Sequence, residues 1–191
     1  CFGITETLNP DSARRIYDAC NAQVAEPTFS DRQLMLRYHV ESVCTTDDPI
    51  DDLHHHQAIR QSGFAVKVLP AWRPDKAIAM GDPAAYNDYL DRLEQVSGVQ
   101  IKKLDDLLQA LQLRHDYFAQ QGCRIADHGL SKFPFRKASK TQLDTDFQTI
   151  RAGKPLSEEA TEALQTYLLL ELARRNARKG WVQQIHYGPL R

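Results

Sequence analysis

The chain of 191 residues has no long hydrophobic run and no excess of one charge. A membrane-spanning helix needs about 18–20 uncharged apolar residues, and the most apolar helical run, residues 167–170, is followed at once by Glu171. Lysine and arginine number 24 against 25 aspartates and glutamates, which gives a formal net charge of −1. A general nucleic-acid binder needs a concentrated basic surface to displace counterions from phosphates. We therefore expect neither membrane insertion nor nucleic-acid binding.

Cysteine is scarce, and several common motifs are missing. The four cysteines, Cys1, Cys20, Cys44 and Cys123, show no C-x-x-C spacing and follow no signal peptide, so neither a zinc knuckle nor a disulfide framework is indicated. We expect each cysteine to be a small buried residue in a cytoplasmic protein. The sequence has no G-x-G-x-x-G, P-loop or G-x-S-x-G motif. This removes the usual grounds for dinucleotide binding, nucleotide triphosphate binding and serine hydrolysis.

What the sequence does contain is an alternation of short apolar strands and longer helices. Hydrophobic residues make up 42% and charged residues 26% of the chain, as in a folded domain. The apolar spacing and the helix start and stop signals predict helices over about 10–24, 31–37, 50–61, 83–96, 104–121, 140–150 and 155–179. Runs of β-branched and aromatic residues predict strands over 38–46, 64–70, 123–129 and 181–188. This order is typical of a parallel α/β sheet.

Ionisable residues end all four predicted strands. In a parallel α/β barrel the active site forms where the strands end and the loops to the helices begin. Four polar strand ends on otherwise apolar strands therefore predict a polar cavity at one mouth of a barrel. The four ends are Asp47-Asp48, Trp72-Arg73-Pro74-Asp75, Asp127-His128 and His186-Tyr187.

Arg73 and His186 are the strongest single candidates at these ends. The planar guanidinium of Arg73 could bind a carboxylate at any working pH, or it could form a loop salt bridge with Asp75. His186 could ligate a metal or transfer protons near neutral pH, or it could be a structural histidine. The residue types alone leave both alternatives open.

The other strand-end residues also have two interpretations. Asp47 and Asp48 precede Pro49, so they could form a carboxylate pair or only cap the loop and the helix that follows. Asp127 and His128 are neighbours on a strand, so at most one of them faces the cavity.

Two further features are expected to be structural. The three consecutive histidines 54–56 splay about 100° apart on a helix, so we expect a solvated helix face and no metal cluster there. Trp72 and Trp181 are expected to be packing residues, although Trp72 adjoins Arg73 and its contact with a ligand stays open.

Four blocks at these strand ends resemble the uronate isomerase family, also called glucuronate isomerase, an outlying branch of the amidohydrolase superfamily. They are CTTDDPID at 44–51, KVLPAWRPDK at 67–76, DHG at 127–129 and GWVQQIHYG at 180–188. Their order and spacing also match over essentially the whole chain. The resemblance implies part of a metal-dependent (β/α)8 TIM-type barrel with about half of its strands present. Residues 1–191 would be the central segment of one catalytic domain, with helical insertions at about 83–121 and 133–179.

The resemblance also implies an activity. The family interconverts D-glucuronate with D-fructuronate and D-galacturonate with D-tagaturonate by proton transfer between C1 and C2. By similarity, Arg73 and His186 are catalytic, and the residues that bind the uronate are Arg73, Trp72, Asp47, Asp48 and His128. A divalent metal, zinc, is implied for the intact enzyme. Its ligands would lie outside this segment, because the family's His-x-His would precede Cys1 and its Asp-x-Arg would follow Arg191.

The chain starts at Cys1, without an initiating methionine, and stops at Arg191, so we interpret it as a segment of a longer protein. An isolated half-barrel exposes strand edges and an apolar face. We therefore expect a homo-oligomer in the intact protein and no activity from the segment alone. Two alternatives stay open, a metal-dependent hydrolase of the amidohydrolase type and an inactive structural module.

Overall fold

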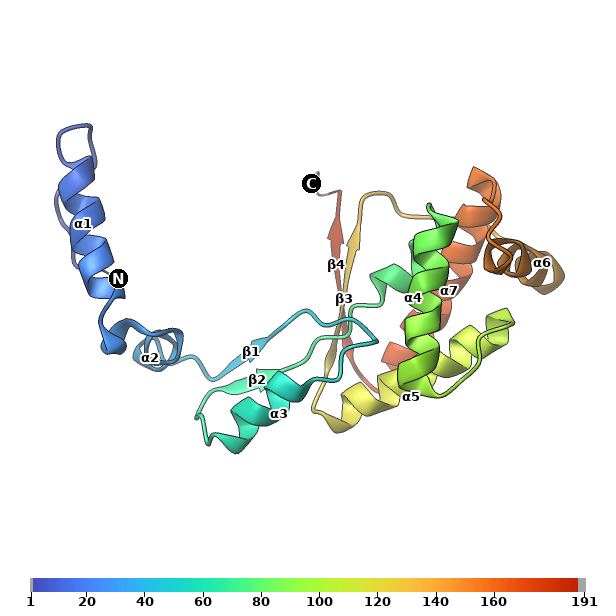
Figure 1. Cartoon of the computed structure of the whole chain (residues 1–191), viewed down its shortest axis with the longest axis horizontal. Coiled ribbons are helices and arrows are strands. Elements are labelled where there is room, and N and C mark those ends of the chain that lie inside the picture. Colours follow the sequence, from blue (N-terminus) through green and yellow to red (C-terminus); the bar gives the residue numbers. More distant parts are fainter. Residues whose placement is uncertain (1, 189–191) are drawn as a thin grey trace.

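Four short parallel strands follow one another in chain order (Figure 1). The computed structural model describes residues 2–188. Strand β1 pairs with β2, and β3 pairs with β4, both in parallel. The strands are short runs of the apolar and β-branched residues that favour extended backbone; their bounds are Ser42–Cys44, Lys67–Leu69, Ile125–Leu130 and Val182–Tyr187. The predicted mixed α/β architecture is confirmed.

Trp72 joins the two strand pairs through its backbone. It forms parallel bridges with Asp47 on one side and Ala126 on the other. The Trp72 amide donates to the carbonyl of Ile125 over 3.0 Å, and the Asp127 amide donates to the carbonyl of Trp72 over 2.9 Å. The backbone ladder therefore continues from β1 through β2 and β3 to β4, and the ends of all four strands are held together.

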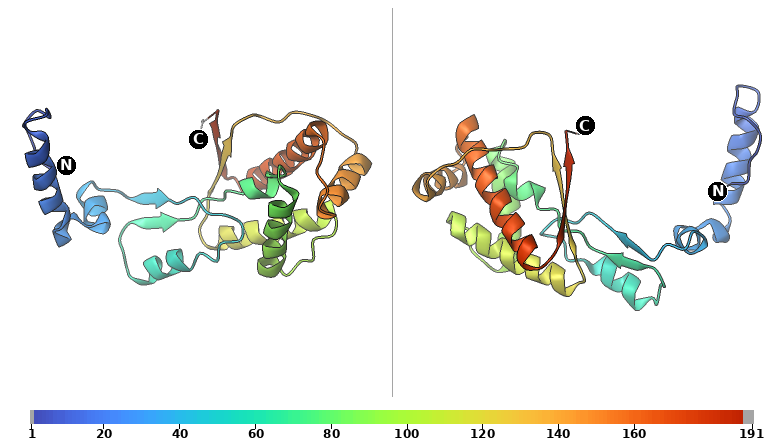
Figure 2. Two further views of the ribbon diagram at one scale, coloured as in Figure 1. Left: turned by 45° about the horizontal axis from the view of Figure 1, so that its top comes forward. Right: turned by 180° about the vertical axis from the view of Figure 1, so that it is seen from behind.

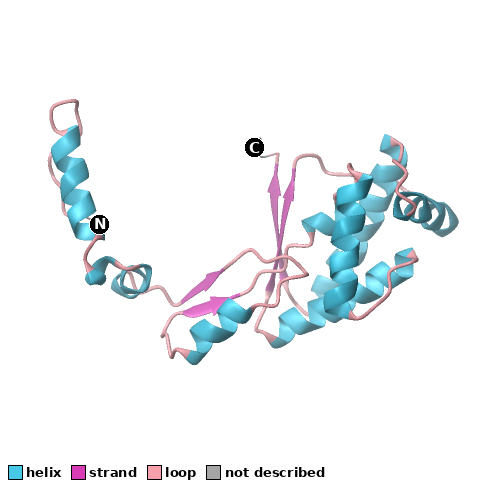
Figure 3. Cartoon of the chain, in the orientation of Figure 1, coloured by secondary structure: helices cyan, strands magenta, loops and turns pink. Residues whose placement is uncertain are grey.

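Helices separate the strands (Figure 3). The α-helices α1 to α7 span Ala13–Val24, Asp31–Arg37, His54–Gln61, Pro83–Ser97, Leu104–Gln120, Lys140–Arg151 and Glu158–Arg178, and the 3-10 helices η1 and η2 span Pro27–Phe29 and Asp75–Ile78. Helix α2 has the predicted bounds. In Figures 1 and 2, α1 and α2 extend away from the other elements, and neither helix has a buried residue.

Several predicted elements are shorter in the structure than in the sequence pattern; for example, the strand predicted over 64–70 is only Lys67–Leu69. The strand predicted over 38–46 begins only at Ser42, because Tyr38 still caps α2 and His39 has a positive φ of 53°. The helix predicted over 50–61 begins at His54. Before it, the side chains of Asp48 and Asp51 accept hydrogen bonds from the amides of Ile50 and Leu53 and hold the chain in turns.

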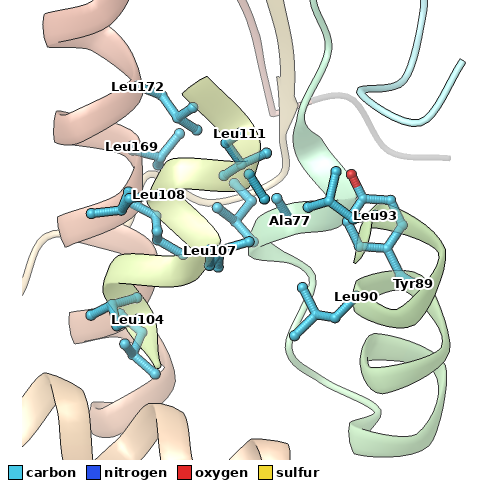
Figure 4. Close-up of a cluster of buried hydrophobic side chains, with 14 of the residues drawn as sticks. Ala77, Tyr89, Leu90, Leu93, Leu104, Leu107, Leu108, Leu111, Leu169 and Leu172 are labelled. Carbon is cyan, nitrogen blue, oxygen red and sulfur yellow. The ribbon is translucent and has the colours of Figure 1, made fainter. Parts of the chain in front are cut away.

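The core lies between α4, α5 and α7 (Figure 4). In α5, Leu104, Leu107 and Leu111 recur at the spacing of one helical face and are completely buried. Leu90 and Leu93 of α4 meet this face. Since each buried leucine stabilises the fold by about 2–5 kcal/mol relative to alanine, this helical layer is a firm support for the strands.

The cysteine prediction is correct for only one of the described positions. Cys123 is buried, whereas Cys20 is half-buried and Cys44 is exposed. Cys44 ends a three-residue strand whose residues are exposed or half-buried, so it has no surrounding core. Cys1 lies outside the described residues.

Candidate active site

Ionisable groups within β3 and β4 and in the segment after β2 form one connected group around Arg73. We call Arg73, Asp75, Asp127, His128 and His186 the Arg73 cluster. Arg73 Nε donates to Asp75 Oδ2 over 2.8 Å, and Arg73 Nη1 lies 3.4 Å from Asp127 Oδ2. The hydrogen bond to Asp75 raises the pKa of Arg73, although partial burial opposes this. The predicted salt bridge between Arg73 and Asp75 is confirmed, and a second carboxylate faces the same guanidinium.

Asp75 accepts hydrogen bonds from three separate donors. Besides Arg73, these are the His128 ring at 2.9 Å from Nδ1 to Oδ1 and the Gly129 amide at 2.9 Å from Oδ2. Burial alone would raise the pKa of Asp75, but the bonds from His128, Arg73 and Gly129 hold it below the usual value. The sequence suggested Asp75 only as a partner of Arg73. Its contacts with β3 join residues more than fifty positions apart, and no local pattern signals them.

His186 is the accessible imidazole of the cluster. Its side chain is 51% exposed, and its Nε2 lies 3.0 Å from Asp127 Oδ1. The geometry is not that of a hydrogen bond, since Asp127 Oδ1 has no such partner among residues 2–188, so the contact is electrostatic. Gln184 Nε2 lies 3.0 Å from the same ring nitrogen. The structure thus brings His186 and Arg73 to opposite sides of one buried carboxylate, that of Asp127.

Two of the residues expected to bind substrate are instead enclosed. Trp72 and His128 both have 0% exposure. The Trp72 ring packs edge-on against His115 and Phe118 with centroid distances of 5.3 and 5.0 Å. Within this chain Trp72 is a packing group, as Trp181 is, and the His128 ring contacts Asp75. His128 Nε2 has no hydrogen-bond partner within the described residues.

Asp47 and Asp48 have separate partners. Asp47 is buried, and its Oδ2 accepts from the Thr45 hydroxyl over 2.6 Å and from the Ala71 amide over 3.1 Å. Asp48 Oδ1 accepts from the Ile50 amide over 3.1 Å, and Asp48 Oδ2 lies 3.3 Å from Lys76 Nζ. The loop-capping interpretation is confirmed for Asp48. The residue at the N-cap of α3 is Leu53, so the expected helix cap at Asp48 is wrong.

The three consecutive histidines differ in their surroundings. His54 and His55 are exposed, as expected for a solvated face. His56 is buried, and its Nε2 lies 2.7 Å from the Thr45 hydroxyl and 3.8 Å from Asp47 Oδ2. The solvated interpretation is wrong for His56, because α3 packs beside β2 and turns this residue toward Thr45, just after β1.

A cavity of about 310 Å³ opens beside the cluster. Asp75 and Gly129 of the strand ends form part of its wall. Ser131, Lys132 and Gln165 add polar groups from the following loop and from α7. The cavity therefore offers hydrogen-bonding groups and a cation next to the Arg73 cluster, which suits a small polar ligand.

The described residues do not supply a metal centre. Within residues 2–188, no group of three or more histidine, cysteine, aspartate or glutamate side chains is close enough to hold an ion. The imidazoles of His128 and His186 contact different carboxylates. In the same part of the chain, no helix combines the length and the apolar character needed to cross a membrane.

Comparison with known proteins assigns the chain to one family. The sequence is 45% identical to the uronate isomerase of Phocaeicola vulgatus and 46% identical to that of Bacteroides thetaiotaomicron, over 190 residues in each case. Each match covers 100% of this chain and 41% of the relative, so the chain spans well under half of the relatives' length.

Solved structures show the same relationship. The uronate isomerase of Thermotoga maritima superposes with a TM-score of 0.89 at 25% identity, over 97% of this chain and 41% of that one. The glucuronate isomerase of Caulobacter crescentus gives a TM-score of 0.87 at 31% identity, over 97% of this chain and 38% of that one. The sequence model of the glucuronate isomerase family matches residues 1–191 from end to end. The chain belongs to the glucuronate isomerase family.

Proposed function

We propose that this chain is the central part of a uronate isomerase, which interconverts D-glucuronate with D-fructuronate and D-galacturonate with D-tagaturonate. The observation that supports the proposal is the Arg73 cluster, whose residues lie in sequence blocks shared with the family and adjoin a cavity with Asp75 and Lys132 in its wall. Relatives that share 45–46% of the residues are uronate isomerases. The segment alone is expected to be inactive, since the rest of the protein is needed to complete the site.

The parallel order of the four strands supports a (β/α)8 barrel in the intact protein. Consecutive strands in such a barrel are neighbours, and each is followed by a helix. Here β1 to β4 are neighbours in chain order. Helices α4 to α7 lie within residues 83–121 and 133–179, and we propose that these two stretches are helical insertions between barrel strands.

The reaction needs a proton shift and no oxidant. A base takes the proton from C2 of the aldose while the O1 oxygen gains a proton, which gives an enediol. The O2 proton then leaves as C1 gains one, which gives the ketose. His186 is the imidazole of the cluster with an accessible ring, so we assign it to the proton-transfer path. Asp127, 3.0 Å away, stabilises the imidazolium that forms.

The formal charges of the cluster bear on how a uronate carboxylate binds. Arg73 carries one positive charge, and Asp75 and Asp127 carry two negative charges at neutral pH. The sum is −1 while both imidazoles are neutral, which repels the uronate carboxylate. Protonation of His186 brings the sum to zero. Arg73 can then bind the carboxylate or a developing enediolate oxygen through the guanidinium hydrogens that Asp75 does not use.

We assign the divalent metal of the intact enzyme, zinc, to residues outside this chain. The described residues do not form a metal centre, and we derive no step through a metal. The partner implied by the family is a small-molecule uronate. We also propose that the intact protein is a homo-oligomer in the cytoplasm.

The test is a uronate isomerisation assay on the full-length protein in D₂O. We expect turnover of D-glucuronate or D-galacturonate with deuterium incorporated from solvent at the reacting carbon. Arg73→Ala and His186→Ala should each lower kcat/KM by roughly 10²–10⁴-fold. Arg174→Ala, which removes an exposed guanidinium bound to Glu171, is the control and should keep wild-type activity. Absence of uronate turnover, or hydrolysis of a carboxylated amide in its place, would overturn the proposal.

A further inference from the structure

Arg114 is a buried arginine without a carboxylate partner. It lies on α5 and is 9% exposed. Its Nε donates to the carbonyl of Pro49 and its Nη2 to the carbonyl of Asp51, both over 2.7 Å. No acidic side chain pairs with it among residues 2–188. A buried charge is normally paired with an opposite charge. The Arg114 guanidinium instead donates its hydrogen bonds to the backbone of one loop.

Tyr117 strengthens the same attachment one turn later. Its hydroxyl donates to the carbonyl of Asp52, and the Arg114 guanidinium lies 4.3 Å from its ring centroid. Gln57 Nε2 donates to the Tyr117 hydroxyl over 3.2 Å. Three loop carbonyls, those of residues 49, 51 and 52, are therefore held from α5.

The loop is held in a conformation that it would not adopt by preference. Leu53 at its end is buried and has a φ of 57°, in the left-handed region that a non-glycine residue adopts only at a cost of about 1–3 kcal/mol. The Leu53 amide donates to Asp51 Oδ1 over 2.7 Å. Such a conformation persists when surrounding contacts determine it, and Arg114 and Tyr117 provide those contacts.

The loop connects directly to the Arg73 cluster. It follows Asp47 and Asp48, and the Asp51 amide donates to the carbonyl of Asp48 over 2.9 Å. The Arg73 amide donates to the carbonyl of Asp47 over 2.9 Å. The path from Arg114 to Arg73 thus runs through the loop and the end of β1, and each step is a hydrogen bond or a short stretch of backbone.

We propose that Arg114 is a positioning residue for the isomerase site. Its two-pronged bond to the 49–51 backbone holds the end of β1, and through it the backbone of Arg73, in the geometry that the reaction needs. This inference rests on the proposed function. Lysine cannot replace the residue, because one ammonium lacks the planar fork that reaches both carbonyls.

The test compares Arg114→Met and Arg114→Lys with Arg151→Met in the full-length protein. Arg151 is the control: it also bonds a backbone carbonyl, that of Ile101, over 3.0 Å, although unlike Arg114 it pairs with the carboxylates of Asp91 and Glu94. It has no contact with the strand ends. We expect both Arg114 variants to lower kcat/KM for the uronate by roughly tenfold or more, and Arg151→Met to lose a similar amount of thermal stability with wild-type kcat/KM.

Hydrogen exchange gives a second readout that does not depend on activity. The amides of Asp51 and Leu53 should exchange faster in the Arg114 variants and at the wild-type rate in Arg151→Met. If the wild type has no isomerase activity, the proposed function fails, while faster exchange at these amides still supports the positioning of the loop. Unchanged exchange, or losses of activity that merely follow the losses of thermal stability in all three variants, would overturn the inference. Arg114→Lys serves as the test variant if Arg114→Met does not fold.

Discussion

Gly129 leaves the space that the Arg73 guanidinium occupies. A β-carbon at position 129 would overlap with Arg73 Nη2. Gly129 does not have the positive φ that favours glycine elsewhere in this chain, so the close approach of Arg73 is what demands glycine here. The Gly129 amide also donates to Asp75, which places the Arg73–Asp75 pair directly against the backbone of β3.

Gly129→Ala should therefore displace Arg73. We expect kcat/KM of the full-length isomerase to fall by roughly 10²-fold, because a shift of about 1 Å in a substrate-binding group has effects of that size. Gly81→Ala is the control, since a β-carbon at Gly81 meets nothing within 4 Å and its φ is not positive. Equal activity of the two variants would show that Arg73 does not need its observed position.

Asp75→Asn tests how much the charge of the Asp75 carboxylate, which accepts hydrogen bonds from three donors, contributes to stability. Loss of the charge weakens bonds from Arg73, His128 and Gly129, and we expect a loss of about 1–3 kcal/mol in the free energy of unfolding at pH 7. The pKa of Asp75 is lowered in the folded state, so its stabilising contribution is present above the unfolded value of about 3.9. It is lost as the pH falls through the lower folded value.

Urea unfolding at pH 7 and at about pH 3.5 measures this contribution. The difference between wild type and Asp75→Asn should shrink at the lower pH. Asp18→Asn is the reference, because Asp18 forms only an exposed pair with Arg14 and such pairs contribute little. A difference that stays constant with pH would mean that the charge of Asp75 is not what the three donors recognise.

The zinc proposed for the intact enzyme should be needed for turnover and should not be held by His186. We expect dialysis of the full-length protein against a chelator to remove the activity and added Zn²⁺ to restore it. His186→Ala should keep the wild-type zinc content, measured by atomic absorption, because His186 contacts Asp127 and the described residues form no metal centre. A loss of zinc in His186→Ala would instead make His186 a ligand.

Local sequence patterns predicted most of the elements and the gathering of polar strand-end residues around Arg73. The period of apolar residues identified the α5 face that contains Leu104, Leu107 and Leu111, and the polar ends of the strands identified Arg73 and His186. These features depend on residues close together in the chain. The strand ends meet because parallel strands place the same end at one edge.

Contacts between distant segments could not be predicted in this way. His56 resembles its neighbours His54 and His55 in sequence, and only the packing of α3 beside β2 makes it a buried partner of Thr45. The bond from Arg114 to Pro49 joins residues 65 positions apart. Likewise, Trp72 became a core residue because α5 brings Phe118 against its ring. Each of these contacts depends on tertiary packing, which the spacing of apolar residues along the chain does not reveal.

His115 is expected to make stability depend on pH between about 4 and 6.5. It is completely buried, stacks on Trp181 with a centroid distance of 4.0 Å, and its Nε2 lies 3.0 Å from Asn176 Oδ1. Burial lowers the pKa of His115 to about 4, although the bond to Asn176 opposes the shift. The unfolded chain, with a histidine pKa near 6.5, therefore binds the proton more readily than the folded protein.

The free energy of unfolding should accordingly keep its full value above pH 6.5 and decrease as the pH drops toward 4. The expected decrease is about 2 kcal/mol between pH 7.5 and pH 5. His115→Gln keeps an amide donor for Asn176 but cannot titrate, so its stability should lack this decline. Urea unfolding at the two pH values measures the pH dependence of the free energy of unfolding for the wild type and the variant. His55→Gln changes an exposed histidine and should retain the wild-type pH dependence. If His115→Gln also retains it, the proton taken up on unfolding belongs to another group, and the neutral imidazole between Trp72 and Trp181 is not the source of the acid sensitivity.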